Sequence, residues 1–376
     1  MNSYIEEAKK NDIDYKKEES TLKLTIKVKP LNPLNIQLLT KYSFIKKYIN
    51  INKRQYRINI KSVHELPNNR IGILTNFYLL IHSLNSFKLI NKIEPDLKLI
   101  ILDKKKHYPY YYPLFDFLVL KNNDLVIWNS KIIFFYNLKS KEYYQTINEY
   151  NQGKDKSECE IKTVYELSNG NLVSCTSQGL KIYYKKNKEY NLKSKLDDYK
   201  YVEKVVEIKP NILILFTKEF MSRRCCGGIG ADFFDYSIDI YDVEKEIIKN
   251  LKFYDSLISY RREEDINHFL IKNNYLLTRY GYNLDIFKIN ENMELIKSEK
   301  NLESEMRINF LCDYYDDLFF SENSLSVKIY KFEDEKISFF NDFPLHIEGI
   351  KGMFKLKNNL LVMYSKNEIQ VLNSKK

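Results

Sequence analysis

Glycine, proline, tryptophan and cysteine are all scarce in this chain of 376 residues, which holds ten Gly, eight Pro, one Trp and five Cys. So few Gly and Pro exclude collagen-like sequence, Gly/Ser linkers and Pro-rich recognition segments. The cysteines are odd in number and contain no C-x-x-C pair: Cys159, Cys175, Cys225, Cys226 and Cys312. This pattern predicts free thiols in a reducing compartment, which we expect to be the cytoplasm, with the nucleus as an alternative.

Long apolar runs are also missing. Residues 1–20 lack the apolar core of a secretory signal, and no later segment reaches the roughly 18 apolar residues of a membrane helix. Apolar residues nevertheless make up 44% of the chain and charged residues 29%. That composition suffices for a hydrophobic core and excludes a fully disordered chain. With 31 Tyr and 22 Phe, the composition favours strands.

The net charge of +10 comes from one segment. Residues 21–61 carry ten Lys or Arg and no acid, whereas residues 1–20 have four Lys against six acids. Two interpretations remain open, a surface for RNA or anionic lipid and the solvated faces of alternating strands. Only nine of the 60 basic residues are Arg, so the Lys excess is also consistent with codon bias. The candidate anion-binding residues are Lys46, Lys47, Lys53, Arg54 and Arg57.

A strand-turn-strand pattern recurs seven times. In each copy an anchor residue is followed two and three positions later by a turn pair, such as Asn68-Asn69 or Asn169-Gly170. Asn, Asp and Gly tolerate the positive φ of tight hairpin turns, so the pair predicts two antiparallel strands. Apolar residues at +5, and in six copies at +13 and +15, indicate the second and third strands. The anchors are Leu66, Leu120, Leu167, Ile208, Ile271, Tyr314 and Leu356.

The spacing of the anchors predicts the fold. They lie 54, 47, 41, 63, 43 and 42 residues apart, and removing a 17-residue insertion from the fourth copy reduces 63 to 46. Periods of about 40–50 residues with several strands each are typical of propeller blades. The sequence therefore predicts an all-β fold, a seven-bladed β-propeller. An open pair of β-sandwiches is the alternative.

The third copy, LSNGNLVSCTSQGLKIYYKK, resembles the WD-repeat family. Where that family often ends a strand with Trp-Asp, this chain has Tyr136-Asn137, Tyr183-Tyr184, Tyr241-Asp242 and Tyr330-Lys331. The Gly-His pair and the buried Asp of a strong WD repeat are absent, so the resemblance is degenerate. It implies a WD-repeat-like β-propeller and, by analogy of fold, a scaffold for protein interactions.

The seventh copy has residues for only three strands, and an open propeller would expose an unpaired edge. Leu22–Lys29 alternates apolar residues with mostly Lys and predicts the strand that closes the last blade. The 4-3-4 spacing of apolar residues from Leu38 to Ile49 predicts a short amphipathic helix. We therefore divide the chain into a flexible polar N-terminus (1–20), a basic segment with closing strand and helix (21–61) and the propeller repeats (62–376).

The insertion in the fourth copy lies within Lys218–Asp235. Inserted loops on rigid scaffolds often carry function, so this stretch is either a partner-contact loop or a surface hairpin without consequence. Its adjacent cysteines lack the spacing of a zinc site, and no crossover helix follows its Gly-Gly-Ile-Gly. The candidate partner-binding residues are Phe220, Met221, Arg223, Arg224, Phe233 and Phe234.

No catalytic, cofactor-binding or metal-binding set emerges from the sequence. The five histidines are scattered, and we expect His64 and His268 to be core residues. Lys104–Pro113 interleaves basic and aromatic residues, which suits either a single-stranded nucleic acid or an inter-blade loop. We predict a monomeric, non-catalytic intracellular scaffold that binds other proteins. The alternative is a binding module for RNA or anionic lipid through residues 21–61.

Overall fold

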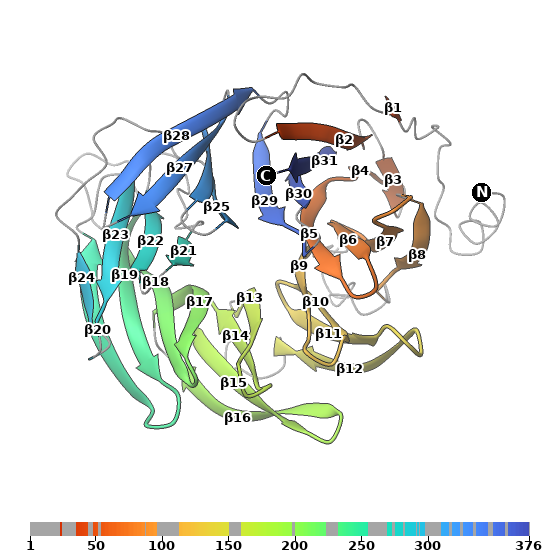
Figure 1. The fold of residues 1–376 in the computed structure, drawn as a ribbon. Coiled ribbons are helices and arrows are strands. Elements are labelled where there is room, and N and C mark those ends of the chain that lie inside the picture. Colours follow the sequence, from red (N-terminus) through yellow and green to blue (C-terminus); the bar gives the residue numbers. More distant parts are fainter. Residues whose placement is uncertain are drawn as a thin grey trace, which may run out of the picture.

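A computed structural model provides the architecture. It describes residues 23–24, 35–43, 48–51, 54–86, 88–95, 113–149, 159–197, 200–222, 232–254, 269–272, 275–280, 283–290, 292, 294–297, 310–315, 318–323, 326–333, 336–344, 349–357 and 360–375. Within these ranges the strands form six four-stranded sheets, one five-stranded sheet and one hairpin. The sheets stand around a common axis, as Figure 1 shows, so the fold is an all-β propeller. No helix long and apolar enough to cross a membrane occurs in the described part of the chain.

Each four-stranded sheet is built from four consecutive strands, with the first strand nearest the axis (Figure 1). The first contains β5 (Ile60–Leu66), β6 (Arg70–Thr75), β7 (Leu79–Ser83) and β8 (Leu89–Ile93). The second contains β9 (Leu114–Val119), β10 (Leu125–Asn129), β11 (Ile132–Asn137) and β12 (Glu142–Asn148). The third contains β13 (Ile161–Glu166), β14 (Leu172–Thr176), β15 (Gly179–Lys186) and β16 (Glu189–Asp197).

The fourth contains β17 (Tyr201–Lys209), β18 (Ile212–Ser222), β19 (Asp232–Asp242) and β20 (Ile247–Tyr254). The fifth contains β21 (Phe269–Lys272), β22 (Tyr275–Tyr280), β23 (Asn283–Ile289) and β24 (Leu295–Lys297). The sixth contains β25 (Phe310–Tyr315), β26 (Leu318–Asn323), β27 (Ser326–Glu333) and β28 (Lys336–Pro344). The hairpin is β3 (Tyr48–Ile51) with β4 (Arg54–Arg57).

The five-stranded sheet joins the two ends of the chain. Its order is β1 (Lys23–Leu24), β2 (Asn35–Ser43), β31 (Glu368–Lys375), β30 (Leu360–Ser365) and β29 (Ile350–Lys355). Two predictions about this region are wrong. The strand that pairs with the last strand of the repeats is Asn35–Ser43. Of the predicted strand Leu22–Lys29 the structure describes Lys23–Leu24, and these residues pair with the other edge of β2. The predicted helix from Leu38 to Ile49 is also wrong, because the described residues of this stretch lie in β2 and β3.

The predicted turns and third strands are confirmed in the described sheets. Asn68, Asn69, Asn123, Gly170 and Asn211 all have positive φ, as hairpin turns between the first and second strands require. The apolar pairs at +13 and +15 lie in the third strands, and the described members are at most 5% exposed. The core is therefore a series of apolar layers between neighbouring sheets. One layer joins Ile60 and Ile71 of the first sheet to Val362 and Val371 of the five-stranded sheet.

Five of the inner strands carry a β-bulge near their first residue. The register slips between Ile60 and Ser62 of β5, and between the equivalent residues of β9, β13, β17 and β29. A bulge leaves one extra residue unpaired and redirects its side chain. Each extra residue lies five positions before an anchor. These residues, which we call the bulge ring, are Lys61, Phe115, Lys162, Glu203 and Lys351.

Two hydrogen-bonding patterns join neighbouring sheets. In the first pattern, the N–H of the first residue of an inner strand donates to a backbone carbonyl of the neighbouring sheet. That carbonyl lies in the turn that joins the second and third strands of the neighbouring sheet. The bonds are Leu114→Asn76 (3.1 Å), Ile161→Ser130 (2.8 Å) and Ile60→Lys366 (2.7 Å). The second pattern lies at the opposite face. There, the side chain of the glutamate that directly precedes one anchor accepts a hydrogen bond from the backbone N–H of the residue that directly follows the anchor of the neighbouring sheet. These latches are Lys121→Glu166 (2.7 Å), Ser168→Glu207 (2.5 Å) and Lys357→Glu65 (2.9 Å).

Candidate functional site

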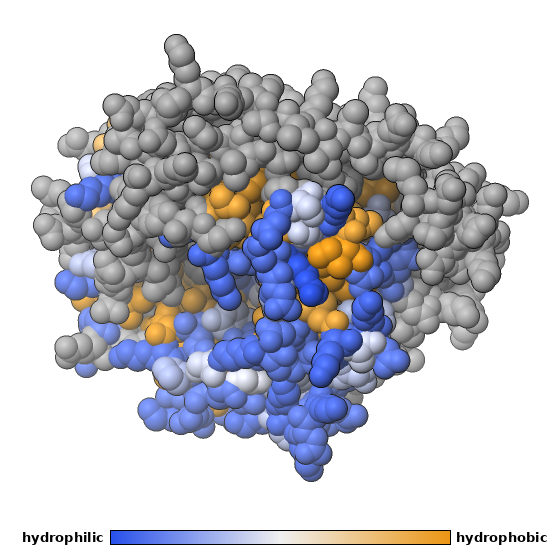
Figure 2. Space-filling model, turned by 45° about the vertical axis from the view of Figure 1, so that its right-hand side comes forward, coloured by the Kyte–Doolittle hydropathy of each residue, from blue (hydrophilic) through white to orange (hydrophobic). Residues whose placement is uncertain are grey.

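The bulge ring lies at one face of the propeller. Its residues stand at the start of inner strands, whereas the anchors and latch glutamates stand at the other end of the same strands. All five side chains are half-buried. Because hydrogen-bonded strands carry them, their backbone positions are fixed before any partner binds. Figure 2 shows one face of the molecule, where hydrophilic side chains of the described residues surround smaller apolar patches.

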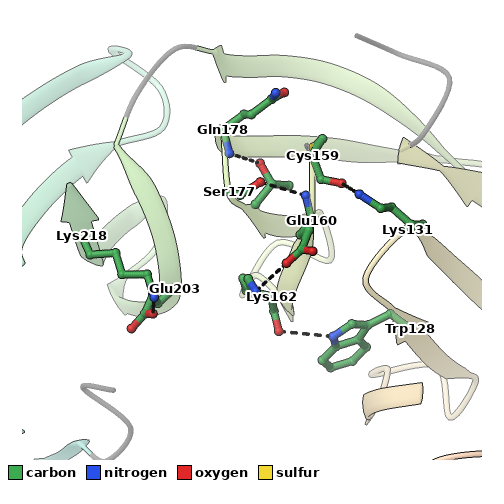
Figure 3. Close-up of polar contacts among 10 residues, drawn as sticks. Trp128, Lys131, Cys159, Glu160, Lys162, Ser177, Gln178, Glu203 and Lys218 are labelled. Carbon is green, nitrogen blue, oxygen red and sulfur yellow. Dashed lines mark hydrogen bonds and ion pairs between the residues drawn. The ribbon is translucent and has the colours of Figure 1, made fainter. Parts of the chain in front are cut away.

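Around β13 and β17 the charges of the bulge ring are neutralised by neighbours. Lys162 Nζ lies 2.8 Å from Glu160 Oε2, and Lys218 Nζ lies 2.5 Å from Glu203 Oε1 (Figure 3). Both ammonium groups also approach the Tyr201 ring, at 5.2 and 4.4 Å from its centroid. Such cation–π contacts add to the ion pairs. This side of the ring is thus a compact set of alternating charges around one tyrosine.

The backbone beneath these ion pairs is also fixed. Trp128 donates its indole N–H to the Lys162 carbonyl at 3.4 Å, and Lys131 Nζ donates to the Cys159 carbonyl at 2.8 Å (Figure 3). Trp128 and Lys131 belong to the second sheet, whereas Cys159 and Lys162 belong to the third or lead into it. The two bonds therefore tie neighbouring sheets together directly below the bulge ring.

Between β5 and β29 the bulge ring carries only positive charge. Burial is the main reason that the pKa of Lys351 falls to about 8, and Lys61 and Lys366 lower it further. The pKa of Lys61 is lowered by burial and by Lys366. Among the described residues, none of these three ammonium groups has a carboxylate within 4.0 Å. This side of the ring is therefore electropositive.

A histidine–aspartate pair lies below the ring. His64 Nε2 of β5 donates to Asp116 Oδ1 of β9 at 3.0 Å, and the Phe117 ring packs edge-on against the imidazole. The expectation that His64 is a core residue is wrong, because its side chain is 42% exposed. Burial acts to raise the pKa of Asp116, but the charge and hydrogen bond of His64 together with the Phe117 N–H hold that pKa below its usual range. The pair ties two neighbouring inner strands together.

The predicted insertion site is partly a paired hairpin. β18 and β19 extend beyond the other hairpins, with Phe220 opposite Phe234 and Met221 opposite Phe233. Of the two interpretations of Lys218–Asp235, the hairpin fits its described residues, but Lys218 itself is packed, being 9% exposed and bound to Glu203. Arg223 and Arg224 lie outside the described residues.

The other candidates are described only in part. In the basic segment Arg54 and Arg57 lie in β4, and Arg57 is exposed, whereas Lys46, Lys47 and Lys53 lie outside the described residues. The stretch Lys104–Pro113 (apart from its last residue) and His268 also lie outside them. In the described ranges no group of three or more His, Cys, Asp or Glu is placed to hold a metal ion. The thiols of Cys159 and Cys175 are free and buried, and burial raises the pKa of both.

Sequence reasoning missed the bulge ring, although a signal for it exists. An isoleucine followed by a lysine recurs six and five positions before an anchor, in Ile60-Lys61, Ile161-Lys162 and Ile350-Lys351. Aligning the copies upstream of the anchor as well as downstream would have placed the three lysines at one level of the ring. The charged neighbours of these lysines could not be found in the same way. Glu160, which pairs with Lys162, and Lys366, which lies near Lys61 and Lys351, stand at unrelated positions of their copies.

No protein-family model and no curated protein matches the chain. Solved structures do match. A chain in the crystal structure of the mitotic checkpoint complex is similar over 95% of this chain and 98% of its own, with a TM-score of 0.59 and 9% identity. A streptogramin B lyase covers 84% and 93% (TM-score 0.55, 11% identity), and virginiamycin B lyase from Staphylococcus aureus covers 90% and 99% (0.56, 10%). At such low identity these likenesses establish the fold alone, a β-propeller distantly similar to all three.

Proposed function

We propose that this protein is a non-catalytic scaffold that binds other proteins at the face carrying the bulge ring. The observation that carries the proposal is the ring itself: five inner strands repeat the same bulge and present half-buried charged or aromatic side chains at one level. Rigid strands that carry polar and aromatic groups favour binding, because little conformational entropy is lost on association.

We further propose that the five-stranded sheet is the seventh blade and that β2 closes the ring. Both junction patterns support this arrangement. Ile60 donates to Lys366, and Lys357 donates to Glu65, in the same way as at the internal junctions between sheets. In a closed ring each blade packs between two neighbouring blades, so the first and last blades have no exposed side. Closure is the usual way in which propellers avoid exposed, unpaired edges.

We propose a non-catalytic role because the His64–Asp116 pair, whose residue types could serve in acid–base chemistry, is used in hydrogen bonds within the fold. Asp116 Oδ1 accepts hydrogen bonds from His64 and from its neighbour's N–H, at 3.0 and 2.8 Å. In our interpretation the pair serves to hold β5 against β9. A lyase stands among the similar structures, but function depends on sites rather than on the fold.

Photocrosslinking tests the scaffold proposal. We would replace Lys162 with a photoreactive phenylalanine in cells that make the protein, and place the same group at Ile247 as a control. Ile247 lies on the outermost strand β20 and is 58% exposed. We expect protein adducts from position 162 and few from position 247. Equal adducts at both positions, or none at 162 while partners still copurify, would contradict binding at the bulge ring.

The second candidate function is binding of RNA or anionic lipid through residues 21–61. The observation in its favour is the exposed Arg57, whose carbonyl accepts a hydrogen bond from Asn76 Nδ2 at 3.0 Å, which fixes the arginine at the edge of the first sheet. Replacing Lys46, Lys47, Lys53, Arg54 and Arg57 with Gln should weaken RNA or vesicle binding and reduce its salt dependence. If the unmodified protein binds neither at moderate salt, this candidate is excluded.

A further inference from the structure

The junction of the first and five-stranded sheets concentrates three lysines, which we call the junction lysines: Lys61, Lys351 and Lys366. Their backbone positions are linked directly. Ile60, which precedes Lys61, donates to the Lys366 carbonyl at 2.7 Å. Ile350, which precedes Lys351, pairs with Ser365, which precedes Lys366. Residues far apart in the sequence are therefore held together by the paired backbone.

Lys162 shows what is missing at this junction. It occupies the same bulge position as Lys61 and Lys351 but has Glu160 at 2.8 Å. Glu203, also at that position, has Lys218 at 2.5 Å. The junction lysines have no such partner among the described residues, and the nearest acid along the chain, Glu368, accepts a hydrogen bond from Gln370 at 2.6 Å.

Lys61 and Lys351 are half-buried and Lys366 is exposed beside them, and without a counter-charge among the described residues this grouping of cations is costly. Burial disfavours the charged forms of Lys61 and Lys351, and neighbouring ammonium groups disfavour them further, as the lowered pKa values of these two residues record. A ligand that brings negative charge removes both penalties, because it restores hydrogen-bond acceptors and reverses the local field. The backbone ties hold the three residues together before such a ligand arrives.

We propose that the junction lysines bind the carboxylates of an acidic segment of a partner protein. This inference rests on the proposed scaffold function and adds the chemistry of the partner. The charge pattern of the face favours a short acidic segment over RNA or a membrane. A polyanion lying across the whole face would also meet Asp116, Glu160 and Glu203, whereas a short segment can contact the positive side alone.

The residue type points the same way. All three residues are lysines, which bind single carboxylates as point charges, whereas bidentate recognition of phosphate favours arginine. Lys61 and Lys351 are also half-buried at the mouth of the ring. A peptide side chain can enter there more easily than a flat lipid surface can.

The test is a binding titration of the full-length protein with a fluorescent hexaglutamate peptide at about 50 mM salt, where screening is weak. A hexaglutamine peptide, a single-stranded RNA and phosphatidylserine vesicles serve as comparison probes. The variant replaces Lys61, Lys351 and Lys366 together with Gln. The matched control is Lys357→Gln, an exposed lysine at the opposite end of the same sheet.

We expect hexaglutamate to bind the wild-type protein and the control equally, and the triple variant at least tenfold more weakly. Equal binding by the triple variant would overturn the proposal. So would RNA or vesicle binding that depends on these lysines without any binding of hexaglutamate. Crosslinking at Lys162 is independent of these residues, so the scaffold function and the acidic-segment site can fail separately.

A pH titration keeps the proposal testable if the triple variant does not fold. The charged groups that face Lys351 from the described elements packed against it are Lys61 of β5 and Lys366 of the β30–β31 turn. Because the pKa of Lys351 is about 8, hexaglutamate affinity should fall between about pH 7 and pH 9. Lys351→Arg should remove that fall, since arginine stays charged. A flat profile in the wild type would contradict a role for Lys351.

Discussion

Gly72→Ala should destabilise the protein because the new methyl group has no room. Gly72 lies opposite His64 in the β5–β6 pair, and a Cβ at this position would lie 2.7 Å from Phe117 Cζ and 3.0 Å from Phe117 Cε2. Carbon atoms in van der Waals contact lie about 3.5–4.0 Å apart, so the phenyl ring would have to move by about 1 Å. Phe117 is 1% exposed and belongs to the apolar layer between the first two sheets.

The expected loss is about 1–2 kcal/mol. Overpacking of a well-ordered core costs roughly 1–3 kcal/mol. Replacing a strand glycine by alanine recovers about 0.5–1 kcal/mol, since glycine loses more backbone entropy on folding. The displacement of the Phe117 ring should also disturb its edge contact with His64, since the two ring centroids lie 4.7 Å apart.

Urea unfolding followed by fluorescence measures the change. Trp128 is the only tryptophan in the sequence and is 2% exposed in the second sheet, so its emission reports on the loss of neighbouring core. In the double variant Gly72→Ala, Phe117→Leu, the smaller side chain should accommodate the methyl group, and the two losses should not add. An alanine variant as stable as the wild type, or strictly additive losses, would refute the overpacking argument.

Three further outcomes are expected. Glu65→Ala should lower the free energy of unfolding by about as much as Glu166→Ala, roughly 0.5–1.5 kcal/mol measured by urea unfolding. Both carboxylates accept one latch N–H at a largely exposed site. A Glu65→Ala variant as stable as the wild type would argue against ring closure. Lys351 has a folded pKa of about 8 against 10.5 for a free lysine, so the folded state binds fewer protons between these values. Stability should therefore rise with pH across this window, and Lys351→Met should flatten the rise. Replacing residues 223–231 with Asn-Gly should leave the melting temperature nearly unchanged, whereas replacing Lys218–Asp235 should lower it, since Lys218 is buried and ion-paired.

The repeat could be predicted from the sequence because its signals are local. Asn68-Asn69 and Asn169-Gly170 mark turns through their tolerance of positive φ, and that conformation is present at Asn68, Asn69 and Gly170. The alternating apolar residues of the third strands report burial of one face of the strand, as at Leu180 and Ile182, each 1% exposed and in the same apolar layer. Neither signal requires knowledge of a distant segment.

The N-terminal region could not be assigned in this way. The apolar residues from Leu38 to Ile49 fit a helical period, but pairing of Asn35–Ser43 with Glu368–Lys375 makes the first part of this stretch a strand. The long-range partner decides the structure of an ambiguous segment, and local spacing does not reveal that partner. The clean alternation of Leu22–Lys29 was the stronger local signal, yet the strand that pairs with β31 is β2, and the described residues Lys23–Leu24 pair with β2.

The candidate site was hidden for the same reason. His64 and Asp116 are 52 residues apart, and Lys61 and Lys366 belong to the first and last sheets. The circular arrangement brings such residues together. The lysine at the bulge position can be recognised in the three copies that have one, but the spacing within a copy does not reveal whether an acid neutralises it.

The pairing of β2 with β31 also imposes an order of events during synthesis. Asn35–Ser43 is made early, and its partner Glu368–Lys375 is made after nearly all of the sheets. At translation rates of about 5–20 residues per second, the interval is tens of seconds. The six four-stranded sheets each consist of consecutive strands and can form as they emerge, whereas β2 must wait with its hydrogen-bonding edge exposed. The pairing of β2 with β31 therefore cannot form until β31 has been synthesised, and chaperone binding to β2 during this interval is the point at which the cell could influence the yield of folded protein.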